Sequence, residues 1–184
     1  MKKDPLSRPA FRVALSGIVA ALGVALMLLT SLIPFGTYAF PCAAGALLVI
    51  IVIELNAKWA LGVYAAVSLL SFFLAGDKEA VVYYILLLGY YPMLKNLIES
   101  KVRTKPLRLL FKFAVFNAAA VGAFYITTLL LAVPAEEFSL FGVYVPLVFL
   151  AAGNLVFLVY DLALTSFVVL YVRKIRGKVF SVFK

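Results

Sequence analysis

The sequence predicts an all-α, polytopic membrane protein with six transmembrane helices in a single domain over residues 1–184. Of the 184 residues, 66% are hydrophobic and 14% are charged, and the mean hydropathy is +1.12. Soluble domains are typically about 45–50% apolar and about 25% charged. A soluble fold of this composition would expose large apolar patches. The lysines and arginines also cluster between long charge-free stretches. These observations argue against a soluble enzyme, a nucleic-acid-binding module and a secreted disulfide scaffold.

Charge-free stretches and the breaks between them define the six helices. Residues 13–53 carry no charge and are long enough for two helices of about 20 residues each. Proline and glycine residues at 34–36, followed by Pro41, interrupt this stretch and place the first break there. Polar, basic or proline-containing segments separate the remaining helices, at 54–58, 76–79, 95–108 and 133–137. The expected helices cover residues about 11–33, 38–54, 59–75, 80–97, 109–132 and 143–172.

The cations fall almost entirely on one side of the predicted membrane. With a cytoplasmic N-terminus, Lys78 is the one outer cation, and the other 16 of the 17 lysines and arginines lie inside. Cytoplasmic loops of membrane proteins carry such an excess of lysine and arginine. We therefore expect a multi-pass membrane protein with both termini in the cytoplasm. Five or seven helices would place a basic cluster outside.

Small residues form a stripe along the first helix. Gly17, Ala21 and Ala25 recur at four-residue spacing and share one face. Small residues let membrane helices approach each other closely. This stripe predicts either a docking face for a partner membrane protein or close packing against another helix of the same chain, and the sequence does not separate the two.

Polar residues within the predicted spans are the next candidates. Asp161 and Asn154 lie seven residues apart on one face of the last helix. A carboxylate inside the membrane is costly unless it is paired or functional. Lys112 or Lys95 is the expected partner of Asp161 in a structural ion pair, with a functional role as the alternative. Asn117 is expected to make an interhelical hydrogen bond, and Asn154 is the better candidate for contacting a ligand.

Aromatic residues gather near the predicted outer surface. Tyrosine at a membrane boundary is often an interfacial anchor, and this is the expected role of Tyr90 and Tyr91. The other aromatic residues can line a pocket for a ring compound, because small-molecule sites typically combine aromatic walls with a few polar groups. The predicted substrate-binding residues are Tyr38, Phe40, Tyr83, Tyr84, Tyr125 and Asn154. Acidic residues outnumber Lys78 on this side, which favours a neutral or weakly charged substrate.

Motifs for catalysis are missing. The chain has no histidine, no Gly-x4-Gly-Lys-Ser/Thr loop and no Gly-x-Ser-x-Gly sequence. It therefore lacks the commonest metal ligand, the commonest neutral-pH base and a phosphate-binding loop. We expect no enzymatic activity, no cofactor and no bound metal.

The overall pattern resembles the substrate-binding S components of energy-coupling factor (ECF) transporters. Three features carry the resemblance: the small-residue first helix at 14–22, a loop with proline and aromatic residues at 34–41, and a tight turn leading into Trp59-Ala60-Leu61-Gly62. The similarity is one of architecture over the whole chain. The second helix departs from the family, because it reads Gly45-Ala46-Leu47 and later Glu54 where many members have glycine and proline.

The resemblance implies a transport mechanism in a prokaryotic plasma membrane. An S component captures a vitamin-like small molecule from outside, in a pocket between the first outer loop and helices 4 to 6. It then docks through its first helix onto a membrane coupling protein bound to two cytoplasmic ATPases, which hydrolyse the ATP. The alternative is a non-transport subunit or assembly factor of another membrane complex. A channel is a third possibility, but Asn117, Asn154 and Asp161 are too few polar residues to line a continuous path.

Overall fold

The computed structural model describes residues 9–33, 36–130, 139–140, 143–144 and 146–177. The described part is helical apart from β1 (Ser139–Leu140) and β2 (Val143–Tyr144), which form one short antiparallel pair. Its helices, in chain order, are α1 (Pro9–Leu29), α2 (Gly36–Glu54), α3 (Ala57–Leu74), α4 (Lys78–Tyr83), the π-helical η2 (Tyr84–Leu88), α5 (Tyr91–Lys101), α6 (Lys105–Leu130), α7 (Pro146–Leu170) and the π-helical η4 (Tyr171–Ile175).

These elements form six helices that are long and apolar enough to cross a membrane. One of the six is the composite α4–η2–α5, which covers Lys78–Lys101. The predicted all-α, six-helix class is therefore confirmed. The connection expected at 133–137 lies outside the described residues.

The helix boundaries differ most around the expected basic loop at 95–108. Both flanking helices continue into it, so that α5 ends at Lys101 and α6 begins at Lys105. The predicted boundaries at 97 and 109 each fell four residues short, because the basic residues between them were interpreted as a loop. In the folded chain the ammonium groups of Lys95 and Lys112 pair with carboxylates between the helices, so they do not interrupt them.

Two hydrophobic clusters form the interior. The first joins α1, α2, α3 and η2, through Val19, Met27, Leu48, Ile51, Val67 and Tyr84. The second joins α7 to α2, η2 and α5. Its buried residues are Val49, Leu88, Tyr91, Phe157, Tyr160 and Leu164. Phe116 of α6 stacks on Phe157 of α7, with 4.3 Å between ring centroids. This stack joins α6 to α7, and the contact of Phe157 with Tyr91, at 5.0 Å between ring centroids, joins α7 to α5.

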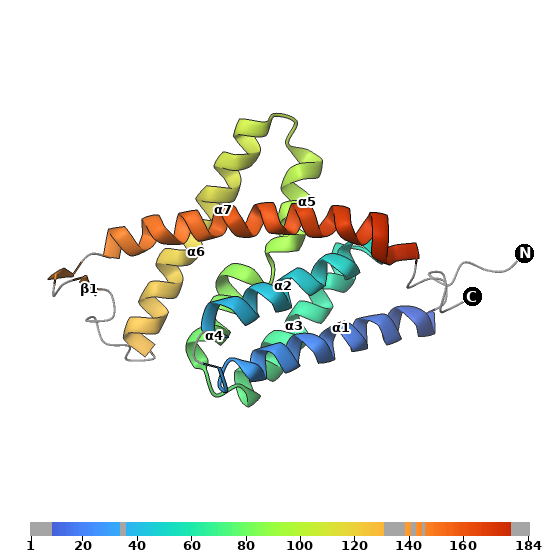
Figure 1. Cartoon of the computed structure of the whole chain (residues 1–184), viewed down its shortest axis with the longest axis horizontal. Helices are drawn as coiled ribbons and strands as arrows, with labels where there is room; N and C mark the ends of the chain where they lie inside the picture. The colour runs from blue at the N-terminus through green and yellow to red at the C-terminus, as the bar shows by residue number, and fades with distance from the viewer. Residues whose placement is uncertain (1–8, 34–35, 131–138, 141–142, 145, 178–184) are drawn as a thin grey trace, which may run out of the picture.

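The fourth span changes direction after η2. Tyr64 of α3 donates a hydrogen bond to the Ile85 carbonyl oxygen at 2.7 Å, and Tyr160 of α7 donates one to that of Leu88 at 3.2 Å. Broken helices persist within a membrane only where such groups satisfy the freed carbonyls. Gly89 is needed at the break, because a Cβ there would lie 2.8 Å from the Tyr84 ring. Beyond it, α5 and the first part of α6 project from the other helices as a hairpin (Figure 1).

Candidate functional site

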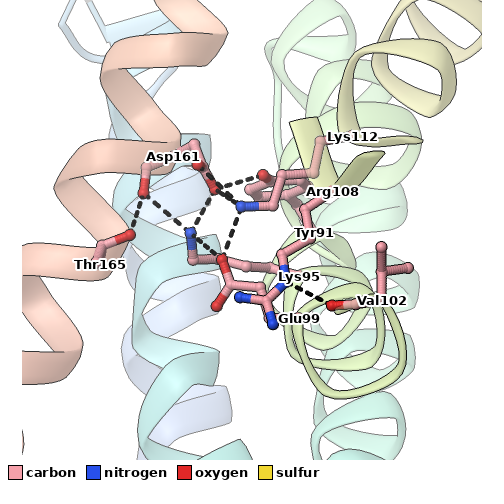
Figure 2. A network of polar contacts seen from close by, with 8 residues as sticks. All are labelled: Tyr91, Lys95, Glu99, Val102, Arg108, Lys112, Asp161 and Thr165. Carbon is pink, nitrogen blue, oxygen red and sulfur yellow. Dashed lines mark hydrogen bonds and ion pairs between the residues drawn. The ribbon is translucent and has the colours of Figure 1, made fainter. Parts of the chain in front are cut away.

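Five side chains from α5, α6 and α7 form a buried ion network, which we call the α5–α7 ion network (Figure 2). Lys95 and Lys112 both pair with Asp161. The distance from Lys112 Nζ to Asp161 Oδ1 is 2.9 Å. Glu99 lies 3.0 Å from Lys95 and 2.7 Å from Lys112. Tyr91 donates its hydroxyl hydrogen to Asp161 at 2.6 Å. Two ammonium groups thus face two carboxylates, and the network is electrically neutral.

The geometry of this network fits a structural role. Asp161 and both lysines are buried, and helical spacing places Lys95 and Glu99 one turn apart on α5. An uncompensated charge here would carry a large desolvation cost. The structure bears out the expected pairing of Asp161 and includes both candidate lysines. Glu99 and Tyr91 were missed, although the four-residue spacing between Lys95 and Glu99 was a usable signal. Tyr91 is not the interfacial anchor that was expected, because it is buried at this centre.

A neutral polar pair lies between α6 and α7. Asn117 donates to Asn154 at 2.8 Å, and Asn154 donates back at 2.9 Å. The second amide hydrogens go to the carbonyl oxygens of Phe113 and Leu150 within the same helices. The expected interhelical bond of Asn117 is therefore present, and Asn154 is its partner. All four amide hydrogens are used, so a ligand would have to displace one of these bonds to reach Asn154.

The N-terminal ends of α2 and α4 carry a second polar group, which we call the outer tyrosine cluster after the membrane side predicted for it. The rings of Tyr38 and Tyr83 lie 5.1 Å apart. Both hydroxyls point to Glu79, with Tyr83 donating at 2.6 Å and Tyr38 at 3.4 Å. Thr37 donates to Asp77 at 2.8 Å, and Asp77 also caps α4 by accepting from the Ala80 amide. The carboxylates of this cluster are held by neutral hydroxyl and amide donors.

Lys78 does not neutralise these carboxylates. Its ammonium group donates to the carbonyl oxygens of Phe72 and Ala75 at the end of α3, at 2.7 and 2.8 Å. The outer tyrosine cluster therefore keeps a negative local charge, which favours ligand groups that are neutral or positive over anions.

The remaining predicted pocket residues lie apart from this cluster. Phe40 is half-buried, and its ring lies against Gly36 one turn earlier. Tyr84 is fully buried in the first hydrophobic cluster, 5.8 Å from the Tyr64 ring, and its hydroxyl has no hydrogen-bond partner among the described residues. Tyr125 is 57% exposed. Of the six predicted residues, the structure brings Tyr38 and Tyr83 into contact.

The described residues contain no group of three or more His, Cys, Asp or Glu side chains that could hold a metal ion. Cys42 is a free, partly buried thiol on α2. The network of Figure 2 also lacks a metal-like arrangement, since both carboxylates are occupied by lysines.

The small-residue stripe of α1 lies on an exposed face of this helix. Gly17, Ala21 and Ala25 are exposed, whereas the neighbouring face of α1 packs inside through Val19, Gly23 and Met27. Gly23 makes the close approach to α3, since a Cβ there would lie 3.1 Å from Val67. The close internal packing that was one interpretation of the stripe is made by this second set of residues.

A groove of about 460 Å³ continues the stripe between α1 and α3. Its walls combine small residues with one aromatic and one basic residue: Val13, Ser16, Gly17, Ala20, Lys58, Trp59, Gly62, Val63 and Ala66. A Cβ at Gly17 or Gly62 would meet no atom within 4 Å. Gly62 and Ala66 extend the small-residue surface to α3; their four-residue spacing was visible in the sequence but was not used.

Comparisons with protein families, with curated proteins and with solved structures give no match. The function of this chain must therefore be inferred from its own residues.

Proposed function

We propose that this protein is the substrate-binding S component of an ECF-type importer. In this role it binds a vitamin-like small molecule from outside and delivers it with a membrane coupling protein and two ATPases. The chain itself has no enzymatic role. It lies in a prokaryotic plasma membrane with both termini in the cytoplasm.

The exposed small-residue surface on α1 supports this proposal most directly. Gly17, Ala21 and Ala25 are all exposed on α1, and Gly62 of α3 adds to the same open region. Lipid chains do not require small residues, whereas a second helix does if its backbone is to come close. An S component needs such a surface on its first helix for the coupling protein.

Affinity purification from native membranes tests this function. The wild-type chain should recover a coupling protein and two ATPases, identified by mass spectrometry. Ala21→Trp should remove them, because a bulky side chain prevents the close helix approach. Val159→Trp is the matched control, since Val159 is also exposed but lies on α7 away from the stripe. If wild-type chain recovers a different membrane complex without ATPases, the alternative role as a non-transport subunit holds instead.

Cysteine labelling tests the proposed topology. In a Cys42→Ala background, a membrane-impermeant thiol reagent should modify Lys78→Cys in intact cells and leave Arg103→Cys unmodified. Lys78 is the first residue of α4, and Arg103 lies in the turn between α5 and α6. The reverse labelling would contradict the cytoplasmic placement of the termini.

The outer tyrosine cluster supports a ligand site at the outer end. Tyr38 is exposed and Tyr83 partly buried, so a planar ring can reach the Tyr38–Tyr83 pair from outside. Glu79 offers an acceptor to a ligand N–H or O–H group, in competition with the tyrosine hydroxyls. Isothermal calorimetry with candidate vitamins should show weaker binding for Tyr38→Ala and Tyr83→Ala than for wild type. Unchanged affinity in both variants would place the ligand elsewhere.

A further inference from the structure

A second groove lies on the outward face of α7 and η4. It has a volume of about 410 Å³ and is lined by Thr165, Ser166, Val169, Leu170, Arg173 and Lys174. Its two cations, Arg173 and Lys174, lie at the η4 end, and the apolar side chains of Val169 and Leu170 lie one turn earlier on α7. The hydroxyls of Thr165 and Ser166 lie one further turn from the cations. No role described above uses these residues.

The π-helical turn η4 determines which side chains face this groove. Tyr171 is 1% exposed and points toward α2, and Arg176, five residues later, pairs with Glu54 of α2 at 3.0 Å. Five residues make about one π-helical turn, so Tyr171 and Arg176 share the inward face. Arg173 and Lys174 are directed to the opposite, exposed side.

Two carboxylates near α7 and η4, those of Asp161 and Glu54, already have cationic partners. Asp161, one turn before Thr165, pairs with lysines of α5 and α6. Glu54 pairs with Arg176. Within the described part of the chain, no ion pair joins Arg173 or Lys174 to a carboxylate. The groove therefore keeps a charge of +2 at the end of a membrane-spanning helix.

This combination fits one anionic phospholipid. A phosphodiester headgroup matches the two cations at the η4 end of the groove. An acyl chain can follow the apolar side chains of Val169 and Leu170 toward Leu162, which is exposed on the same helix. We propose that the α7 groove binds the headgroup of an anionic phospholipid of the leaflet that contacts the ends of α7 and α2. Each basic residue near an anionic membrane surface contributes about 1 kcal/mol, or about fivefold in affinity.

Native mass spectrometry of the purified full chain tests the proposal, with phosphatidylglycerol and phosphatidylcholine as the probes. Wild type should retain phosphatidylglycerol in preference to phosphatidylcholine. Arg173→Gln combined with Lys174→Gln should weaken phosphatidylglycerol binding about 25-fold, which is the product of two roughly fivefold effects. Ser166→Trp should also reduce binding, because it fills the groove without changing the charge.

The matched control removes two cations elsewhere. Lys101→Gln combined with Arg103→Gln makes the same charge change at the α5–α6 turn, where both residues are exposed, and should alter binding less than threefold. Equal losses in the two double variants would overturn the proposal in favour of unspecific attraction to basic residues. Displacement of the lipid by an equal concentration of inorganic phosphate would also overturn it, because the site would then recognise the free anion. Circular dichroism checks that every variant retains its helix content.

Discussion

Asp161 in the α5–α7 ion network and Glu79 in the outer tyrosine cluster are both carboxylates on membrane-spanning helices, but their partners differ. Asp161 is buried between two lysines. Glu79 is half-buried and accepts hydrogen bonds from two tyrosine hydroxyls. A carboxylate whose charge is fully neutralised by lysines is suited to holding helices together, because it leaves no charge for a ligand to pair with. A carboxylate held by neutral donors keeps its charge and can exchange a partner at the surface. The comparison separates a structural site from a site suited to binding.

Removing the charge of Asp161 should have the largest effect on stability. Asp161→Asn keeps the shape but leaves Lys95 and Lys112 with Glu99 as their single carboxylate. Breaking a buried ion pair on one side costs about 3–5 kcal/mol. Equilibrium unfolding in mixed micelles should show a loss of this size. A loss below about 1 kcal/mol would mean that the network is not structural.

A second variant separates charge from packing in the same network. Asp161→Asn combined with Lys112→Met leaves one lysine and one carboxylate, Lys95 and Glu99, which still form a pair. The double variant should be more stable than Asp161→Asn alone, because it no longer buries an uncompensated ammonium group. The same unfolding experiment measures the difference. A double variant less stable than the single one would indicate that the contacts of Lys112, rather than neutrality, stabilise α6 against α7.

At the outer tyrosine cluster the same measurement should give a small loss. Tyr83→Phe removes the hydroxyl that donates to Glu79 at 2.6 Å. Because Glu79 can take a water molecule in its place, we expect a loss of about 1 kcal/mol or less. Glu79→Gln serves as a control for the loss of charge. A loss as large as that of Asp161→Asn would erase the distinction between the two regions.

The Asn117–Asn154 pair tests whether polar contacts without charge suffice to join α6 and α7. A double-mutant cycle with Asn117→Ala and Asn154→Ala should give a coupling free energy of about 0.6 kcal/mol, the average for hydrogen bonds between membrane helices. Ligand affinity should change little in Asn154→Ala, since the amide is already satisfied by Asn117 and Leu150. A large loss of ligand affinity would show that the pair opens on binding and would restore Asn154 as a ligand contact.

Several features were predictable because they follow from local chemistry. An intramembrane carboxylate requires a partner, so Asp161 and the lysines of the neighbouring helix ends could be connected from the sequence. Gly17, Ala21 and Ala25 could be placed on one face from their spacing alone. The pairing of Glu54 with Arg176 could not be foreseen, because 122 residues separate them and many exposed cations were equally plausible partners.

The sequence by itself determined the all-α class and the six membrane-spanning helices, because long charge-free stretches must satisfy their backbone hydrogen bonds within each helix in a bilayer. Helix rotation and helix contacts were decided by the tertiary structure. Packing of Val19, Gly23 and Met27 turned the small-residue stripe of α1 outward. Contacts among spatial neighbours also placed Tyr84 in the core, Tyr125 at the surface and Asn154 against Asn117. Hydrophobic periodicity carries little information in a helix that is apolar on every face, so only the fit between neighbouring helices could fix these orientations.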